Sequence, residues 1–190
     1  MFVCLDGFFM EMFAWNEFLS VGHEAIDEDH KKLLATANML CDPGAQEDRD
    51  TVLSVLDALG RYVGEHFHRE EAVLAAVGFP LIDDHQNLHR ALTADFAQWH
   101  KAVVHRWRPS LGGSIHLRLC EWLIRHIVDE DLRVGFFIRH GRVPSRPERY
   151  PLNEVLSHVD RLMDQAIRRR GIVPADMADY GSVNALRKAG

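Results

Sequence analysis

The chain has little cysteine and no hydrophobic run long enough to cross a membrane. Its three cysteines, Cys4, Cys41 and Cys120, are isolated and form no Cys-x-x-Cys pair. This pattern argues against a disulfide framework and favours reduced thiols in a cytoplasmic protein. No apolar run approaches the roughly 20 residues that a membrane span needs. The apolar N-terminus lacks a basic start and a small-residue cleavage site, so no signal peptide is expected.

Basic residues are also fewer than acidic residues. Lys and Arg number 22 against 28 Asp and Glu, and the formal net charge is −6. Because a basic surface is the usual footprint of nucleic-acid binding, nucleic acid is not an expected partner. With 190 residues, 47% of them hydrophobic and 26% charged, the chain suits one globular domain with a small appendage. The residue in excess is histidine, with 12 copies.

Apolar residues recur at helical spacing along most of the chain, and strand-like alternation is scarce. The pattern predicts four long helices, ended by Gly and Pro signals, over residues 24–41, 50–77, 81–107 and 114–139. Because the connections are short, successive helices should be antiparallel, which predicts an all-α, up-down-up-down four-helix bundle. Gly112 and Gly113 are expected in the turn before the fourth helix.

A second apolar stripe follows a Pro-rich linker. It consists of Leu152, Val155, Leu156, Val159, Leu162, Met163 and Ile167. The stripe predicts a C-terminal helical extension that must bury its apolar face against its own bundle or a partner chain. A homo-oligomer or a protein complex through this helix, 152–170, is therefore one expectation. The predicted domains are an N-terminal extension (1–12), a main domain (13–141) and a linker, helix and tail (142–190).

Candidate metal ligands occur on all four predicted long helices. They are His30, His66, Glu70, His85, His89, His126 and Asp131. Side chains four residues apart share a helix face, so His66 with Glu70, and His85 with His89, can point at one centre. Imidazole suits iron, copper, zinc or nickel, and carboxylates can bridge two ions. Each residue taken singly fits a structural or surface role better; the set carries the argument.

Residue counts from the turns test whether the candidates share one level of the bundle. At 1.5 Å per residue, the second, third and fourth helices bring their candidates to the same level. His30 on the first helix lies fewer residues from the connection between the first and second helices than His66 does. That connection would have to compensate for the difference in height between the two residues. His126 and Asp131 are five residues apart, about 140° around an ideal helix. Asp131 therefore needs a long reach or a local loosening of the helix.

The motif order H, HFxxEE, HxxxH and WLxxHIxxxD, together with the segment FAWNEFLSVGHEAIDEDHKKL, resembles the hemerythrin family, in particular the bacterial hemerythrins. The resemblance covers about residues 13–140 and includes all seven candidate ligands. It implies two iron ions (Fe²⁺/Fe³⁺) bridged by an oxo or hydroxo group. In that family pattern one iron is held by His85, His89 and His126, and the other by His30 and His66. Glu70 and Asp131 bridge the two.

The same resemblance implies that dioxygen binds reversibly at the iron with two histidines, for transport, storage or sensing and not for catalysis. The family positions that line the oxygen pocket are here Phe67, Trp122, Leu123, Ile127 and Val128. Ordinary core packing is the alternative, and it is equally good for Trp122 and Val128. Two other functions stay open: a redox enzyme or iron-handling protein acting on peroxide, nitric oxide or iron, and an oxygen-sensing signalling module.

One position departs from the family pattern. Many relatives carry an aromatic residue three positions after the bridging aspartate, where this chain has Val134, followed by Gly135. The packing around Asp131 should therefore differ from that of those relatives.

Truncation after Gly141 tests the predicted domain boundary. Because the four-helix bundle is complete without residues 142–190, the truncated chain should keep its metal content. The loss should appear in oligomeric state or solubility, measured by light scattering on the full and truncated chains. A truncated chain that cannot hold metal would show that the C-terminal segment belongs to the core fold.

Overall fold

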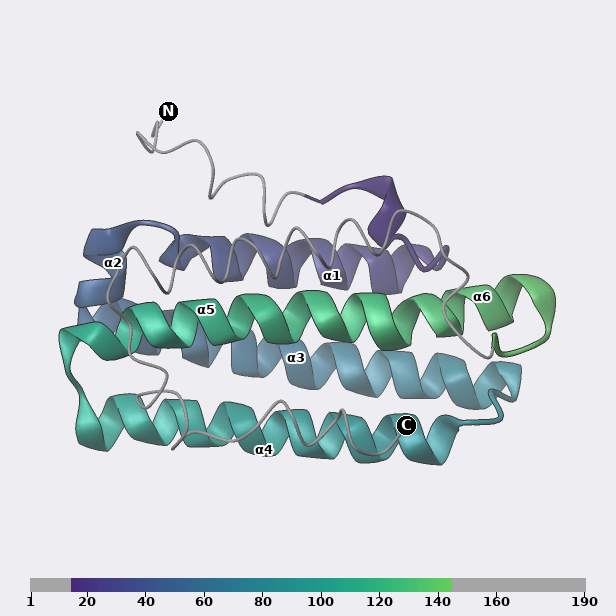
Figure 1. The fold of residues 1–190 in the computed structure, drawn as a ribbon. Helices are drawn as coiled ribbons and strands as arrows, with labels where there is room; N and C mark the ends of the chain where they lie inside the picture. The colour runs from purple at the N-terminus through teal and green to yellow at the C-terminus, as the bar shows by residue number, and fades with distance from the viewer. Residues whose placement is uncertain (1–14, 145–190) are drawn as a thin grey trace.

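The computed structural model describes residues 15–144. Four long helical segments lie side by side in Figure 1: α1 (Glu24–Ala37), α3 (Arg49–Val77), α4 (Ile82–Arg106) and α5 (Pro109–Arg125). The last is continued by a π-helical turn, η3 (His126–Asp131), and by α6 (Leu132–His140). No strand occurs among the described residues. The predicted all-α four-helix bundle is confirmed, whereas the predicted C-terminal extension lies outside the described residues.

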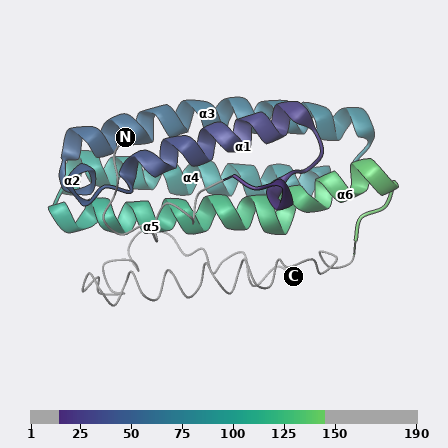
Figure 2. The same cartoon turned by 90° about the horizontal axis from the view of Figure 1, so that it is seen from above.

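Contacts between neighbouring helices close the bundle into a ring, and Figure 2 shows α3 and α5 at opposite edges of the bundle. Helix α3 packs against α1 and α4, and α5 packs against α1 and α4 in turn. Helix α3 begins where the Asp48 side chain accepts a hydrogen bond from the Thr51 backbone N–H, and it ends at Gly78, whose φ of 68° reverses the chain. Within residues 15–144 no helix is long and apolar enough to span a bilayer.

The connection between α1 and α3 is longer and more structured than the other turns. It contains the 3-10 turn η2 (Asn38–Leu40) and the short helix α2 (Pro43–Glu47), which Asp42 caps by accepting from the Ala45 N–H. A further 3-10 turn, η1 (Glu17–Leu19), precedes α1. The segment between α1 and α3 accounts for the poorer residue count of His30, because it absorbs the offset between the two helices.

The start of the fourth helix was predicted wrongly. The helix begins at Pro109, five residues earlier than expected, and Gly112 and Gly113 lie inside it. Proline suits the first helical position because its missing N–H would have no helical partner there. Gly112 is needed for a close helix contact: a Cβ at this position would lie 1.8 Å from the carbonyl oxygen of Gln46 in α2. The glycine is a packing residue, not a turn residue.

Close backbone packing also explains the departure at Val134 and Gly135. Val134 is fully buried and forms a small apolar cluster with Leu74 and Phe79. A Cβ at Gly135 would lie 2.3 Å from the carbonyl oxygen of Val21, so glycine lets the segment before α1 lie directly on α6. At Gly135 the backbones of the two segments meet directly, whereas the rings of Phe79 and Phe137 pack beside Val134.

Gly112→Ala should destabilise the bundle by about 1–3 kcal/mol, because the new methyl group meets the rigid backbone of α2. Gly64→Ala is the matched control: Gly64 lies in α3, and a Cβ added there would meet nothing within 4 Å. That change should stabilise the helix by about 0.5–1 kcal/mol. Urea unfolding of the three proteins measures both effects. Equal stabilities for the two variants would contradict the packing role of Gly112.

Candidate metal centre

All seven candidate ligands meet in the interior of the bundle. Helix α1 contributes His30, α3 contributes His66 and Glu70, α4 contributes His85 and His89, and η3 contributes His126 and Asp131. None of the seven is more than 4% exposed. The four long helical segments therefore bring every one of these predicted residues to a single buried place. Their role as metal ligands stays a prediction.

The Glu70 carboxylate lies among three imidazoles. Its Oε2 atom is 3.2 Å from Nε2 of His85, 3.3 Å from Nε2 of His89 and 3.7 Å from Nε2 of His66. These histidines come from two helices, so Glu70 lies between the α3 and α4 sides of the site. One carboxylate oxygen thus faces donors on both sides, which is the position that a bridging ligand would have.

The Asp131 carboxylate spans the site with its two oxygens. Its Oδ2 lies 3.1 Å from Nε2 of His30, and its Oδ1 lies 3.2 Å from Nε2 of His126. The same Oδ1 is 3.9 Å from Nε2 of His85. Asp131 therefore connects α1 with the opposite side of the bundle, and it has the geometry to bridge two ions.

The π-helical turn makes this reach possible. In an α-helix the side chains at positions i and i+5 point about 140° apart. Between His126 and Asp131 the helix widens to a π turn, which brings the two residues onto one face. The short His126–Asp131 distance is the direct result. The loosening of the helix that the five-residue spacing required is present at this point.

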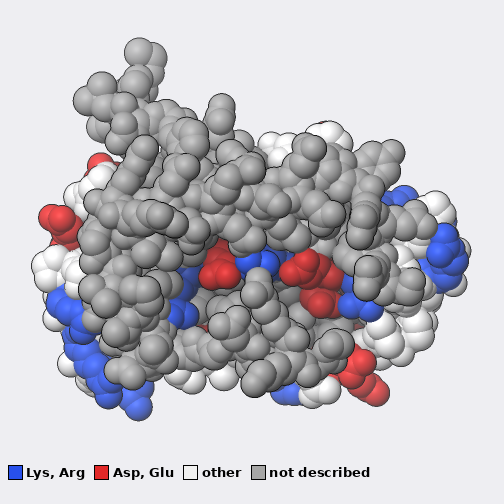
Figure 3. All heavy atoms as spheres, in the orientation of Figure 1, with Lys and Arg blue, Asp and Glu red and all other residues white. Residues whose placement is uncertain are grey.

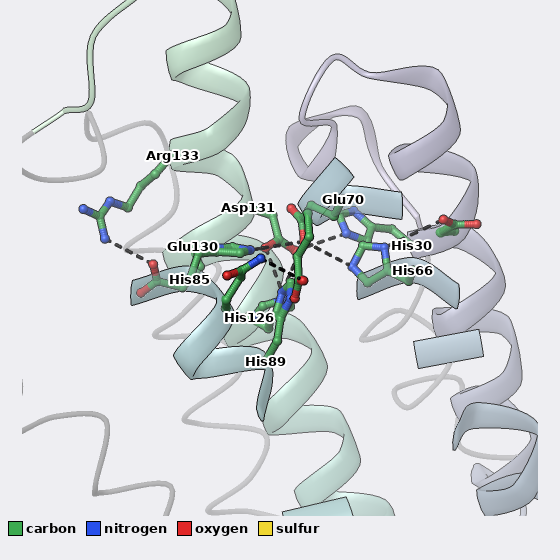
Figure 4. Close-up of polar contacts among 12 residues, drawn as sticks. His30, His66, Glu70, His85, His89, His126, Glu130, Asp131 and Arg133 are labelled. Carbon is green, nitrogen blue, oxygen red and sulfur yellow. Dashed lines mark hydrogen bonds and ion pairs between the residues drawn. The ribbon is translucent and has the colours of Figure 1, made fainter. Parts of the chain in front are cut away.

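The five histidines form two groups, shown in Figure 4 on opposite sides of the two carboxylates. The ring centroids of His85, His89 and His126 lie 4.4–5.7 Å from one another. On the other side the rings of His30 and His66 are 4.8 Å apart. Three imidazoles on one side and two on the other suit two metal positions with unequal numbers of donors.

Burial keeps three of the imidazoles neutral. It lowers the pKa of His66 to about 4 and also lowers the pKa values of His30 and His126, with the Glu70 charge opposing the shift in each case. Burial also disfavours a charged His85, but the hydrogen bond to Glu70 and the charges of Glu70 and Asp131 raise its pKa. A neutral imidazole offers a lone pair, so His30, His66 and His126 are ready to bind a metal at neutral pH.

The two carboxylates are held in opposite charge states. Burial would raise the pKa of Glu70, but hydrogen bonds with His85 and His89 and the charges of His85 and His66 outweigh it and hold that pKa well below its usual range. Burial, followed by the negative charge of Glu70, raises the pKa of Asp131 well above its usual range. A cation between the two groups would allow both to ionise.

The unsatisfied atoms of the cluster fit a metal centre. His30, His66 and His126 have no hydrogen-bond partner on either ring nitrogen, and Nε2 of His89 and both oxygens of Asp131 also lack one. Buried polar atoms normally have such partners, because an unmet hydrogen bond costs about 1–3 kcal/mol. Four-residue subsets around Glu70 and His126 bring their donor atoms within 4.8 Å of one another. Ligation satisfies these atoms together.

Two further carboxylates, which the sequence analysis did not select, lie beside the candidate ligands, and one of them, Glu71, positions a ligand through a hydrogen bond. Nδ1 of His89 donates to Glu71 Oε1 at 2.8 Å, and Gln86 Nε2 donates to the other Glu71 oxygen at 3.1 Å. This bond fixes the proton on Nδ1 and leaves Nε2 of His89 facing the site. On the opposite side Asp29 lies 3.8 Å from Nδ1 of His66 and pairs with Arg69. Glu71 is the second Glu of the motif HFxxEE, and its place beside Glu70 was the sequence feature that could have indicated this role.

The five predicted oxygen-pocket residues are all buried. Two of them contact ligand histidines: the Phe67 ring stacks on His89 with a centroid distance of 3.7 Å, and the Trp122 ring lies 6.3 Å from that of His126. Leu123, Ile127 and Val128 belong to the same apolar core. The lining role of these five residues stays a prediction.

Fold and site together define a class: a four-helix-bundle protein whose core holds a histidine–carboxylate cluster suited to metal. Comparison with known families agrees. The family model described as the hemerythrin HHE cation binding domain matches residues 21–135. The chain therefore belongs to the hemerythrin family, and the resemblance inferred from the sequence motifs is confirmed.

Individual relatives come from bacteria and from an animal. The bacteriohemerythrin of Pseudomonas paraeruginosa is 24% identical over 132 residues, which is 70% of this chain and 85% of the relative. The bacteriohemerythrin of Stenotrophomonas maltophilia is 24% identical over 122 residues, 64% of this chain and 78% of the relative. The myohemerythrin of Theromyzon tessulatum is 28% identical over 123 residues, 65% and 91% of the two chains.

Glu71→Ala should weaken metal binding roughly 10- to 100-fold, because His89 loses the group that fixes its tautomer and ring orientation. The matched control is Asp57→Ala: Asp57 also lies in α3 and also bonds a histidine, His100, at 3.0 Å, but Asp57 is exposed and His100 is only partly buried. Competition with a chelator of known affinity measures the metal affinity of each variant. If both lose affinity equally, the positioning role of Glu71 is wrong.

Proposed function

We propose that this chain binds dioxygen reversibly at two iron ions held by the seven clustered residues, and that it acts as a carrier, store or sensor instead of an enzyme. The observation that supports the proposal most strongly is the uneven grouping of five imidazoles around two buried carboxylates. His85, His89 and His126 would hold one iron, and His30 and His66 the other. Glu70 and Asp131 would bridge them, together with a solvent-derived oxygen.

The donor set favours iron in a low oxidation state. Five neutral imidazoles and two carboxylates supply only two negative charges, which leaves a pair of ferrous ions with little excess anionic charge. When bound, such a pair would supply electrons that dioxygen takes up and returns. The side with only His30 and His66 offers fewer protein donors, so this side has room for a small exogenous ligand.

The surroundings of the site limit the access of water. Phe67 stacks on His89 and its ring is also 5.4 Å from that of His126. Trp122 lies beside both Phe67 and His126. Rings packed against the ligands reduce the entry of water and protons, which favours reversible binding over turnover. These two residues would protect the site, and Leu123, Ile127 and Val128 would extend the same apolar lining.

A spectroscopic cycle tests the function. The iron-loaded protein is reduced without air, exposed to dioxygen and then returned to an inert atmosphere. A visible charge-transfer band should appear with dioxygen and disappear on its removal over several cycles. Glu70→Ala should lose this band, because the bridging carboxylate is gone, whereas His100→Ala should keep it, since His100 pairs with exposed Asp57 far from the cluster.

The same experiment separates the competing functions. A band that bleaches irreversibly, or a steady consumption of dioxygen, peroxide or nitric oxide, would indicate a redox enzyme and contradict reversible binding. Identical behaviour of the Glu70 and His100 variants would show that the assignment of the ligands is wrong.

A further inference from the structure

Helix α5 has apolar residues on two faces. Ile115, Leu119 and Trp122 lie on one face, and Leu117, Cys120 and Ile124, which belong to the same buried cluster, lie on another. Together with Gly113, the latter three residues form a second stripe. At 100° per residue this second stripe points about 160° away from the residues of the first face. These residues are four, three and four positions apart, which is the spacing of apolar residues along the contact line of two packed helices.

This second stripe points away from the bundle but is not exposed to solvent. In Figure 2, α5 lies at one edge, with α1, α3 and α4 all on one side of it. Leu117 and Cys120 are nevertheless 0% exposed and Ile124 is 3% exposed. Every residue from 111 to 120 is buried, whereas α3 and α4 each show a regular exposed face. Helix α2 contacts the start of α5 at Gly112 and His116, so the stripe beyond these residues needs a further cover. On the described part of the surface in Figure 3, acidic and basic side chains are interspersed.

We propose that the C-terminal segment 152–167 covers this stripe by packing along α5 in an antiparallel direction. The segment's own apolar residues repeat at the same three- and four-residue spacing, from Leu152 through Val159 to Ile167. Its length matches: 16 helical residues span about 24 Å, against about 26 Å for the 17 residues of α5.

The position of the segment in the chain also favours this partner. The described chain ends at 144, just past α6, which continues α5, so residues 145–151 need only reverse direction. Seven extended residues reach up to about 25 Å, enough to return to the level of η3. Tethering of this kind raises the effective concentration of the segment far above that of a second copy.

Disulfide trapping on the full-length chain tests the proposal. Antiparallel pairing places Cys120 opposite the middle of the segment, so Leu156→Cys, Val159→Cys and Met163→Cys are made one at a time, with Cys4→Ser and Cys41→Ser removing the other thiols. Arg161→Cys is the matched control, because it lies two residues from Val159 on the opposite helix face. Diamide, an azo oxidant, forms the disulfide, and peptide mapping identifies it.

At least one of the three positions should form an intrachain link to Cys120 in at least tenfold higher yield than Arg161→Cys. Links between chains would show that a second copy covers the stripe, and the absence of any link would overturn the proposal as well. A second measurement needs no new thiol: the rate at which a maleimide alkylates Cys120. Val159→Asp should raise this rate at least tenfold, and Arg161→Asp should leave it unchanged; equal rates would contradict the pairing.

Discussion

Burial of two carboxylates among five imidazoles is the constraint on which the rest of the structure depends. A buried, unpaired charge costs several kcal/mol, and unmet hydrogen bonds add to that cost. Glu70 and Asp131 are both fully buried, and the charge of Glu70 suppresses ionisation of Asp131. The cluster is therefore poorly satisfied by protein groups alone. A pair of cations would resolve the charge conflict and satisfy the unpartnered donor atoms at once, which ties the stability of the core to the binding of metal.

Several local features of the fold follow from this requirement. The π turn at His126–Asp131 places two donors on one face, where an α-helix would separate them. Glu71 directs the lone pair of His89 into the site, and Asp29 lies behind His66 on the other side. The close contact of α5 with α2 at Gly112, in turn, positions α5, the helix that leads directly into His126 of η3. The positions of the helices and the orientations of the side chains thus bring the candidate ligands together at one level of the bundle interior.

Much of this arrangement could be predicted from the sequence, for physical reasons that differ between residues. Helical periodicity predicted the four long helices, and four-residue spacing predicted that His66 and Glu70, and His85 and His89, share faces. The need for a loosened helix before Asp131 also followed from spacing alone. The roles of Gly112 and Glu71 did not, because one depends on a backbone contact between distant segments and the other on a pairing between α3 and α4. From the sequence alone, the pair Gly112 and Gly113 predicts a turn; the contact between α5 and α2 shows that Gly112 is needed for helix packing.

The metal content of the purified protein is the most direct test of the central claim. After expression in iron-replete medium, elemental analysis of the folded chain should give two iron ions per chain. The result follows if three histidines hold one ion, two hold the other, and Glu70 and Asp131 bridge them. One zinc ion per chain, or a chain that folds without any metal, would contradict the account, because the seven buried donors would then have no pair of cations to bind.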